Sequence, residues 1–291
     1  MKSMMKRNTF REIKKSFGRY FAILAIVALG VAFFSGLKIT QSVMVHSADV
    51  YLKDLQFYDY RLVSTLGFTE ENVEALAEKE DVRAAEGAIS AEVLYKDAGE
   101  NERVIKMHSI TEKVNKLKLV AGEMPQSADE CVVDSVLFSE DAIGSKLVLS
   151  ENNTTDDLDK FAYKEYTITG LVQSPCYIQF ERGNTSIGNG RISGFAYILK
   201  DGFAVDYDTE IYIKFDEDYD IYSDEYDSYM DAKEADWEAY TKEQADIRYE
   251  KIVKDAQDEL DEKKEELEEK RAEAEAELES AKPVSYTHLR A

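Results

Sequence analysis

The sequence predicts a membrane-anchored α+β protein with one N-terminal transmembrane helix, an extracytoplasmic mixed α/β core domain and a long C-terminal charged helix. Three observations predict this class. Residues 20–37 form an apolar run without a charge, residues 58–215 alternate apolar segments with turns, and residues 223–282 contain no Pro or Gly. The expected segments are a cytoplasmic basic amphipathic segment (1–19), a transmembrane helix (20–39), the core domain (40–222), a long helix or coiled-coil arm (223–282) and a non-native tail (283–291).

The apolar run Tyr20–Leu37 (YFAILAIVALGVAFFSGL) is long enough to cross a bilayer. As a helix it measures about 27 Å, close to the roughly 30 Å of a hydrocarbon core. Seven Lys and Arg residues precede it and only Lys38 follows closely, so the positive-inside bias keeps the N-terminus cytoplasmic. A cleaved signal peptide is the alternative, but such peptides have shorter apolar regions that end at small residues. Phe33, Phe34 and Leu37 suit that cleavage poorly, so we expect an uncleaved anchor.

Small residues recur along one face of this run. Ala28, Ala32 and Gly36 are spaced by four residues, so they stack on one side of a helix. Such a stripe lets the backbone of another membrane helix approach closely. We therefore expect a packing face for further helices, and a chance stripe in an Ala-rich span is the alternative.

The basic segment before the run has its own apolar face. Phe10, Ile13 and Phe17 follow a spacing of three to four residues, with basic residues on the other faces. This pattern is typical of a short interfacial helix on an anionic membrane surface. A solvated basic flank is the alternative interpretation.

Charge is distributed very unevenly along the chain. The formal net charge is −23, but residues 41–291 hold 28 Lys and Arg against 58 Asp and Glu. So acidic an exterior argues against nucleic acid as a partner. With two Cys and three His, a zinc ribbon or a disulfide framework is excluded. Cys131 and Cys176 would both lie outside the cytoplasm, and a disulfide between them is the less favoured alternative because each lies in apolar sequence.

The exterior part predicts an α+β sandwich, with helices on one face of a mixed sheet. Alternating or β-branched runs predict the strands. We expect them at residues 58–64, 81–88, 91–95, 103–107, 131–133, 146–149, 167–172, 195–199 and 211–215. Gly67 is expected to end the first strand, and Thr69 to cap a helix carrying Val73, Leu76 and Ala77. A short helix is expected over residues 136–142, and a polar loop over residues 152–160.

The final third predicts one long solvated helix that begins near Ser223. Val253, Leu260, Leu267 and Ala274 keep a seven-residue period, but the complementary seam is too polar for a two-stranded coil alone. We interpret it as one arm of an extracytoplasmic hairpin, with a free-standing charged helix as the alternative. Proline at position 283 is expected to end the helix. The last nine residues, PVSYTHLRA, resemble translated sequencing-adapter readthrough, so we expect a truncated chain with a non-native tail.

No catalytic or ligand-binding signature emerges. Gly183–Gly194 lacks the Lys-Ser/Thr of a P-loop and the spacing of a dinucleotide-binding loop, which favours a hairpin tip. Asp206–Asp231 is acidic but contains no calcium-binding loop pattern. His46, His108 and His288 lack metal-ligand spacing. We therefore expect neither an enzyme nor a cofactor.

Several passages, in order, resemble FtsX-like (MacB-type) ABC transporter permeases of Gram-positive bacteria. Arg7–Lys38 is similar to the start of that family. Lys116–Asp134 (KLKLVAGEMPQSADECVVD) resembles its L-x-x-G-x-x-P-x-x-x-x-E passage, and Ile143–Ser150 (IGSKLVLS) and Tyr166–Pro175 (YTITGLVQSP) resemble two of its strands. The resemblance covers about residues 5–230 and consists of hydrophobic and turn patterns.

The resemblance implies the N-terminal part of a permease that exports a lipid, peptide or other amphiphile. It implies a cytoplasmic ABC ATPase subunit as partner, further permease transmembrane helices or a second permease copy, and membrane lipid. The later spans of the family are absent, so we expect a fragment whose full reading frame holds more spans. The alternative is a single-span anchored extracellular binding or adhesion protein on a helical stalk, and a secreted, signal-cleaved module comes third.

Overall fold

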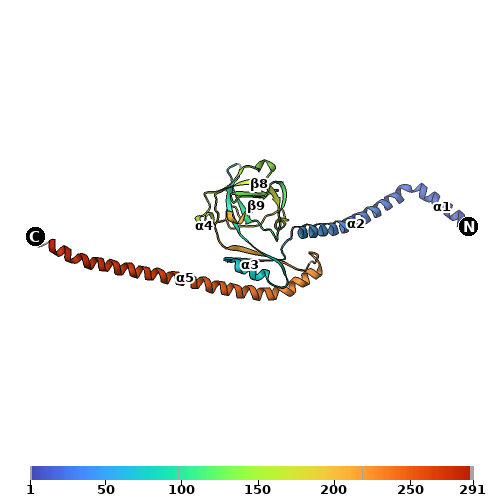
Figure 1. Cartoon of the computed structure of the whole chain (residues 1–291). Helices are drawn as coiled ribbons and strands as arrows, with labels where there is room; N and C mark the ends of the chain where they lie inside the picture. Colours follow the sequence, from blue (N-terminus) through green and yellow to red (C-terminus); the bar gives the residue numbers. More distant parts are fainter. Residues whose placement is uncertain (1, 98, 218, 289–291) are drawn as a thin grey trace. The chain divides into compact units, whose positions relative to one another are not determined.

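The computed structural model describes residues 2–97, 99–217 and 219–288. The chain divides into two compact units, Met1–Tyr222 and Ser223–Ala291, and each is described by itself. The first unit contains two N-terminal helices and a β-rich domain (Figure 1). The second is a single helix. This is the mixed α+β class that the sequence predicts.

Two helices lead into the β-rich domain. α1 spans Lys2–Lys15 and α2 spans Phe17–Asp54. Ser16 breaks the helical path between them, so the predicted basic helix exists but Phe17 falls in α2, where its ring stacks on Phe21 at 6.0 Å. Among the described residues, α2 is the one helix whose length and composition suit a membrane crossing.

Seven strands of the domain form one mixed sheet in the order β5-β8-β6-β9-β4-β3-β7. Their bounds are β3 Ser90–Lys96, β4 Glu102–Ser109, β5 Lys118–Gly122, β6 Glu130–Asp134, β7 Lys146–Leu149, β8 Glu165–Gln173 and β9 Ile192–Ile198. The pairs β4–β9 and β6–β8 are parallel. β7 pairs with β3 on one side and with the first residues of β8 on the other.

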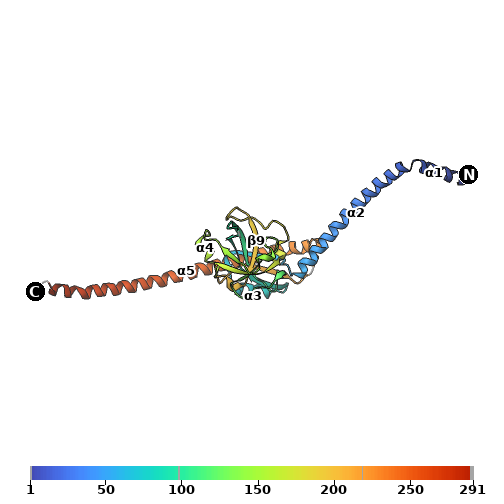
Figure 2. The ribbon, with the colours of Figure 1, turned by 90° about the horizontal axis from the view of Figure 1, so that it is seen from above.

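This double pairing of β7 closes the sheet on itself, so six strands form a barrel and β5 extends one edge of β8. Figure 2 shows β9 within this domain, to which α2 leads. The predicted sandwich with helices on one face is therefore wrong in its layout. The sheet closes because β8 is long enough to pair with β7 near its start and with β5 near its end. Closure leaves fewer exposed strand edges.

The barrel encloses the main hydrophobic core. Its strands alternate inward and outward side chains, as the pattern of β3 shows. Val93, Ile105, Met107 and Val133 are completely buried there. Each buried side chain of this size contributes about 1.5–3 kcal/mol relative to an exposed one.

The domain also contains a three-stranded antiparallel sheet. It is connected directly to the barrel, because its strand β2 is followed in the chain by β3 of the barrel. Its order is β1-β10-β2, with β1 Tyr60–Phe68, β2 Val82–Ala88 and β10 Asp208–Phe215. α3 (Glu70–Ala77) contacts β2, and the Thr69 N–H donates to the Asn72 side chain at 3.0 Å, which confirms the predicted cap.

Two local predictions are wrong, and one strand was not predicted. Gly67 lies within β1 rather than ending it: its φ of +73° accommodates an irregularity, after which pairing resumes at Phe68. An alanine Cβ there would lie 2.5 Å from the Tyr207 ring. The helix expected over residues 136–142 reduces to η1, Glu140–Ala142, because Ser139 adopts an extended conformation. The strand β5 was not predicted.

The remaining helical turns are short. They are α4 Thr155–Leu158 within the predicted polar loop, η2 Pro175–Tyr177 and η3 Lys200–Gly202. A bridge between Asn184 and Arg191 agrees with the hairpin tip predicted for the Gly-rich segment.

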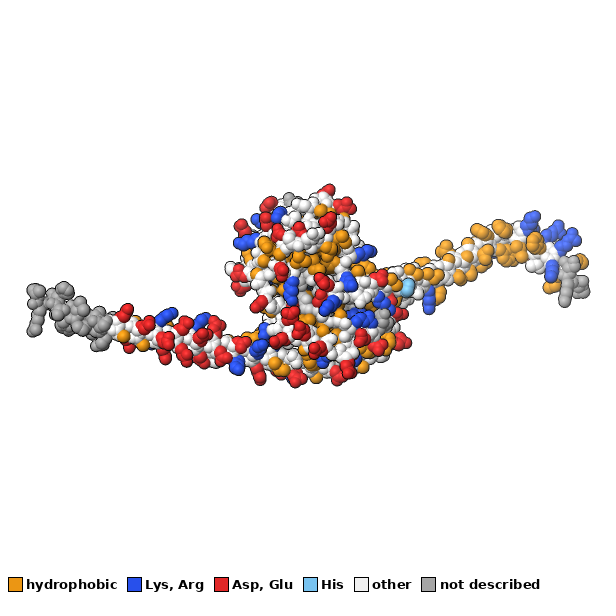
Figure 3. Space-filling view, in the orientation of Figure 1, with side chains coloured by type: hydrophobic (Ala, Val, Ile, Leu, Met, Phe, Trp, Pro, Cys, Tyr) orange, Lys and Arg blue, Asp and Glu red, His pale blue; other side chains and the backbone are white. Residues whose placement is uncertain are grey.

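The second unit is α5, Asp224–His288. Its surface carries mostly acidic and basic side chains (Figure 3), with Glu259 and Lys263 forming an i,i+4 ion pair at 2.5 Å. Val253, Leu260 and Leu267 are half exposed or more, so the coiled-coil arm stays a prediction. The helix continues through Pro283, so the predicted end there is wrong. A proline inside a helix removes one i→i−4 hydrogen bond, and α5 extends five residues past it. That residues 283–291 are a non-native tail stays a prediction. Residues 289–291 lie outside the part of the chain that the structure describes.

Candidate functional site

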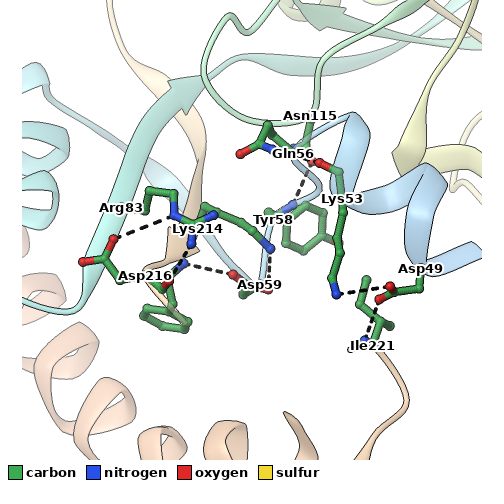
Figure 4. Close-up of polar contacts among 11 residues, drawn as sticks. Asp49, Lys53, Gln56, Tyr58, Asp59, Arg83, Asn115, Lys214, Asp216 and Ile221 are labelled. Carbon is green, nitrogen blue, oxygen red and sulfur yellow. Dashed lines mark hydrogen bonds and ion pairs between the residues drawn. The ribbon is translucent and has the colours of Figure 1, made fainter. Parts of the chain in front are cut away.

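The point where α2 enters the β-rich domain concentrates polar contacts between distant segments (Figure 4). We call it the junction and define it as residues 49–59, 112–116, 213–216 and 219–221. The last turns of α2 are buried here, with Leu52 2% and Asp49 7% exposed. The rest of α2 is exposed along its length. The junction is therefore where motion of α2 would reach the domain.

A Schellman motif ends α2. Gln56 adopts a left-handed φ of 52°, and the N–H groups of Gln56 and Phe57 donate to the carbonyls of Lys53 and Leu52 at 3.0 and 2.9 Å. These are the two hydrogen bonds that define this helix end. The Gln56 side chain also donates to Lys53 O at 2.8 Å. The chain direction after α2 is thus set by local backbone geometry.

One carboxylate and one ammonium connect α2 to the segment that follows β10. Asp49 Oδ1 accepts the Ile221 N–H at 2.9 Å, and Asp49 Oδ2 lies 3.1 Å from Lys53 Nζ. Lys53 Nζ also donates to Asp220 Oδ1 at 2.6 Å. This hydrogen bond raises the pKa of Lys53, although burial opposes the shift, and the same bond lowers the pKa of Asp220. The contact therefore favours the charged forms of Lys53 and Asp220.

The helix end also binds the loop between β4 and β5. The carbonyls of Leu55 and Gln56 accept the N–H groups of Lys116 and Asn115 at 2.8 and 2.9 Å. Asn115 Oδ1 accepts the Tyr58 N–H at 3.1 Å. Asn115 has a φ of 54°, which this residue type tolerates better than most. α2 is therefore hydrogen-bonded to a loop of the barrel.

A buried ion pair connects the chain after α2 to β10. Asp59 Oδ1 lies 3.0 Å from Lys214 Nζ, and Asp59 Oδ2 accepts the Phe215 N–H at 2.9 Å. Both side chains are at least nine-tenths buried. At the next residue, Arg83 donates to Asp216 O at 2.5 Å. These contacts hold β10 and β2 beside the start of β1.

The loop that meets α2 is itself held by a carboxylate of the small sheet. Glu86 accepts the N–H groups of Glu112, Lys113 and Val114 at 2.8, 2.9 and 3.0 Å. Val114 is completely buried against the small sheet. Because Glu86 lies in β2, both sheets meet at the same loop.

The junction connects α2 to both sheets. The end of α2 is hydrogen-bonded to a barrel loop and to the segment after β10, and Glu86 of β2 holds that loop. Among the described residues, no group of three or more His, Cys, Asp or Glu side chains could hold a metal ion.

The residues predicted from the sequence lie elsewhere. Phe10 and Ile13 are exposed on α1, and Ala28, Ala32 and Gly36 are exposed on α2. Cys131 and Cys176 are both free thiols. Burial raises the pKa of Cys176 to about 11 and raises that of Cys131 further, so neither is a ready nucleophile. The structure has no bond between the two thiols, and their disulfide stays the less favoured alternative.

Sequence reasoning missed the junction. The only local signal was an Asp and a Lys four residues apart, Asp49 and Lys53, directly after apolar sequence. Their partners lie far along the chain, so the pair alone did not identify a site.

No protein-family model matches the sequence, and no curated protein matches it. Among solved structures, the chain is similar to the extracellular domain of the noncanonic ABC-type transporter YknZ from Gram-positive bacteria, with 12% identity, a TM-score of 0.35 and coverage of 53% of this chain and 76% of that one. It is also similar to the periplasmic region of MacB from Actinobacillus actinomycetemcomitans, with 13% identity, a TM-score of 0.35 and coverage of 55% and 69%. A domain of a putative permease protein from Porphyromonas gingivalis has 14% identity, a TM-score of 0.31 and coverage of 53% and 63%.

Proposed function

We propose that this chain is part of an FtsX-like ABC transporter permease subunit that exports a lipid, peptide or other amphiphile. In this proposal α2 crosses the membrane with the N-terminus in the cytoplasm, and the β-rich domain lies outside. A cytoplasmic ATPase subunit supplies ATP hydrolysis. Further permease helices or a second permease copy complete the transport path.

One observation carries the proposal: α2 runs without a break from its apolar part into the junction. It contains 38 residues, which is about 57 Å of helix. That length exceeds the roughly 30 Å of a hydrocarbon core, so the helix projects well beyond the bilayer. A stiff helix bonded to the domain transmits movement, whereas a flexible linker would not.

The free energy of the junction contacts opposes separation of α2 from the domain. Each hydrogen bond contributes about 0.5–1.5 kcal/mol net, and those to charged groups about 1.5–3 kcal/mol. The hydrogen bonds of Asp49 with Ile221, and of the Leu55 and Gln56 carbonyls with residues 115–116, therefore resist separation of α2 from the domain by several kcal/mol together. ATP-driven movement of α2 would then move the domain as well.

Co-purification tests the proposal. We expect that the tagged full chain, expressed in a Gram-positive host and extracted from membranes, brings down an ABC ATPase subunit. ATPase activity of that complex should become uncoupled in Lys53→Ala, which removes the ion pairs with Asp49 and Asp220 at the junction, and stay normal in Lys263→Ala. The second variant removes an i,i+4 ion pair of the same spacing between exposed side chains of α5. Absence of any ATPase from the purified material refutes the proposal.

Orientation has an independent test. A cysteine introduced at Ser42, which is exposed on α2 beyond the apolar run, should react with a membrane-impermeant maleimide on intact cells. A cysteine at Thr9, exposed on α1, should react only after permeabilisation. The reverse pattern contradicts the proposed topology.

A second function is favoured by α5, a helix of 65 residues with a charged surface. Such a helix suits the stalk of a single-span anchored extracellular binding or adhesion protein. This alternative predicts that the chain purifies from membranes without an ATPase. The co-purification experiment therefore separates the two functions.

A further inference from the structure

A cavity of about 300 Å³ lies in the β-rich domain beside the last turns of α2. Tyr51 of α2 lines one side, and Tyr177 and Phe195, whose rings stack at 4.4 Å, line another. Ile178 and Phe180 at its rim are 56% and 85% exposed. The lining is mainly apolar, and its size is at the lower end of the range for ligand pockets.

The one cation of this cavity is already neutralised. Arg182 Nε lies 2.7 Å from Asp134 Oδ2, and Arg182 Nη2 lies 3.0 Å from Asp134 Oδ1. Arg182 Nη1 donates to the carbonyls of Tyr177 and Gln179. These contacts use four of the five guanidinium N–H groups, and Asp134 balances the charge, so the cavity offers an anionic head group little net positive charge. It therefore favours an apolar group over an anion.

Large apolar side chains recur on one face of α2, called here the stripe, from the predicted membrane span to this cavity; beyond Leu37 they are two turns apart, with Thr40, Gln41 and Ser47 between them. Five large side chains share one helix face, because their separations of seven, four, seven and seven residues are close to whole turns. They are Ile26, Phe33, Leu37, Met44 and Tyr51. The first four are more than half exposed, and the last lines the cavity. From Leu37 to Tyr51 the helix rises about 21 Å.

The opposite side of α2 is different. Asp49 and Lys53 face the segment after β10 with their charges paired. Outside the predicted span, Asp49 and Lys53 therefore bind the domain, while Met44 on the other face is exposed. Lipid is the medium that covers such a face within the bilayer, and the same face continues to the cavity.

We propose that this cavity binds one acyl chain of an amphiphile that leaves the outer face of the bilayer along the stripe. The inference rests on the proposed export function and narrows its substrate class to acylated molecules. The apolar lining, the exposed rim and the neutralised arginine suit a hydrocarbon chain.

Photo-crosslinking tests the inference on the full chain in bilayer nanodiscs. The probe is a phosphatidylcholine with a diazirine at the end of one acyl chain, and mass spectrometry locates the adducts. We expect adducts on α2 within residues 20–37 and also on residues 173–182. In Phe180→Ser the second set should fall by about tenfold or more, since a large apolar contact is lost. Tyr163→Ser, at another exposed aromatic residue, should leave both sets unchanged.

Folding is checked in each variant by protection of the buried Cys131 thiol from a maleimide. Adducts confined to residues 20–37 would overturn the inference, as would equal adducts in the two serine variants. A partner helix seated on the stripe is the competing occupant, and it predicts no adduct on residues 173–182. Crosslinking needs no ATPase, so the two experiments are independent. If the ATPase co-purifies but residues 173–182 carry no adducts, only this inference is refuted. If those adducts form but no ATPase co-purifies, only the proposed function is refuted.

Discussion

The buried ion pair between Asp134 and Arg182 should contribute much more to stability than an exposed pair of the same charges. Their side chains are 2% and 6% exposed, and two N–O contacts join them at 2.7 and 3.0 Å. Asp134→Asn keeps the shape but leaves the buried guanidinium without a counter-charge. Breaking a buried pair in this way costs about 3–5 kcal/mol.

The melting temperature translates this cost into a measurable shift. For a domain of this size each kcal/mol lowers the midpoint by about 2–4 °C, so Asp134→Asn should lower it by about 6–20 °C. The control is Glu165→Gln, which breaks the pair with Lys146 at 3.4 Å, where both side chains are roughly half exposed. Such a pair contributes about 0–1 kcal/mol.

Labelling of Cys131 with a maleimide, followed by mass spectrometry, measures the midpoint. This thiol is completely buried in the barrel core, so it reacts only when the barrel opens. The double variant Asp134→Asn with Arg182→Met removes both charges and should be more stable than Asp134→Asn alone. An equal shift in Asp134→Asn and Glu165→Gln would refute the reasoning, and so would a double variant less stable than the single one.

Three further predictions follow from the fold. Burial lowers the pKa of His108 from 6.5 to about 3. Between pH 6.5 and 3 the imidazole is therefore protonated in the unfolded state but not in the folded state. The free energy of unfolding should fall as the pH drops through this range. The slope is at most about 1.4 kcal/mol per pH unit; urea midpoints from near-ultraviolet circular dichroism should show it, and His108→Gln should flatten it. Gly67→Ala and Gly144→Ala both place a side chain at positive φ, at about 1–3 kcal/mol. Only the first meets a neighbouring ring, so its midpoint for Cys131 labelling should be lower, and equal midpoints would contradict the clash. Ala32→Leu should reduce co-purified ATPase while Cys131 stays protected, and unchanged recovery would count against helix packing at this stripe.

Local patterns predicted many elements because their signals are local. The strand Lys146–Leu149 matches its prediction, since a glycine turn precedes it and apolar residues alternate along it. Thr69 was identified as a helix cap because its neighbours supply the capping pattern within one turn. β5 was missed because Lys118–Gly122 is largely exposed, without the alternation of a half-buried strand.

Neither the closed sheet nor the junction has such a local signal. Closure depends on the pairing of β7 with both β3 and β8. β3 ends at Lys96 and β8 begins at Glu165, so the two strands are far apart in the chain. Asp134 and Arg182 lie 48 residues apart, and Asp49 and Ile221 lie 172 apart. The sequence shows that these residues can ionise or hydrogen-bond, but not with which partner.

The apolar run, the charge asymmetry and a long charged helix beginning near Ser223 were readable from the amino acids alone, because each depends on composition and short-range periodicity. Tertiary structure decided that the large sheet closes into a barrel, that α2 continues past the apolar run into a bonded junction, and that an apolar cavity lies beside it. These features arise from contacts between residues distant in the chain. Burial and geometry select those contacts, and no single segment encodes them.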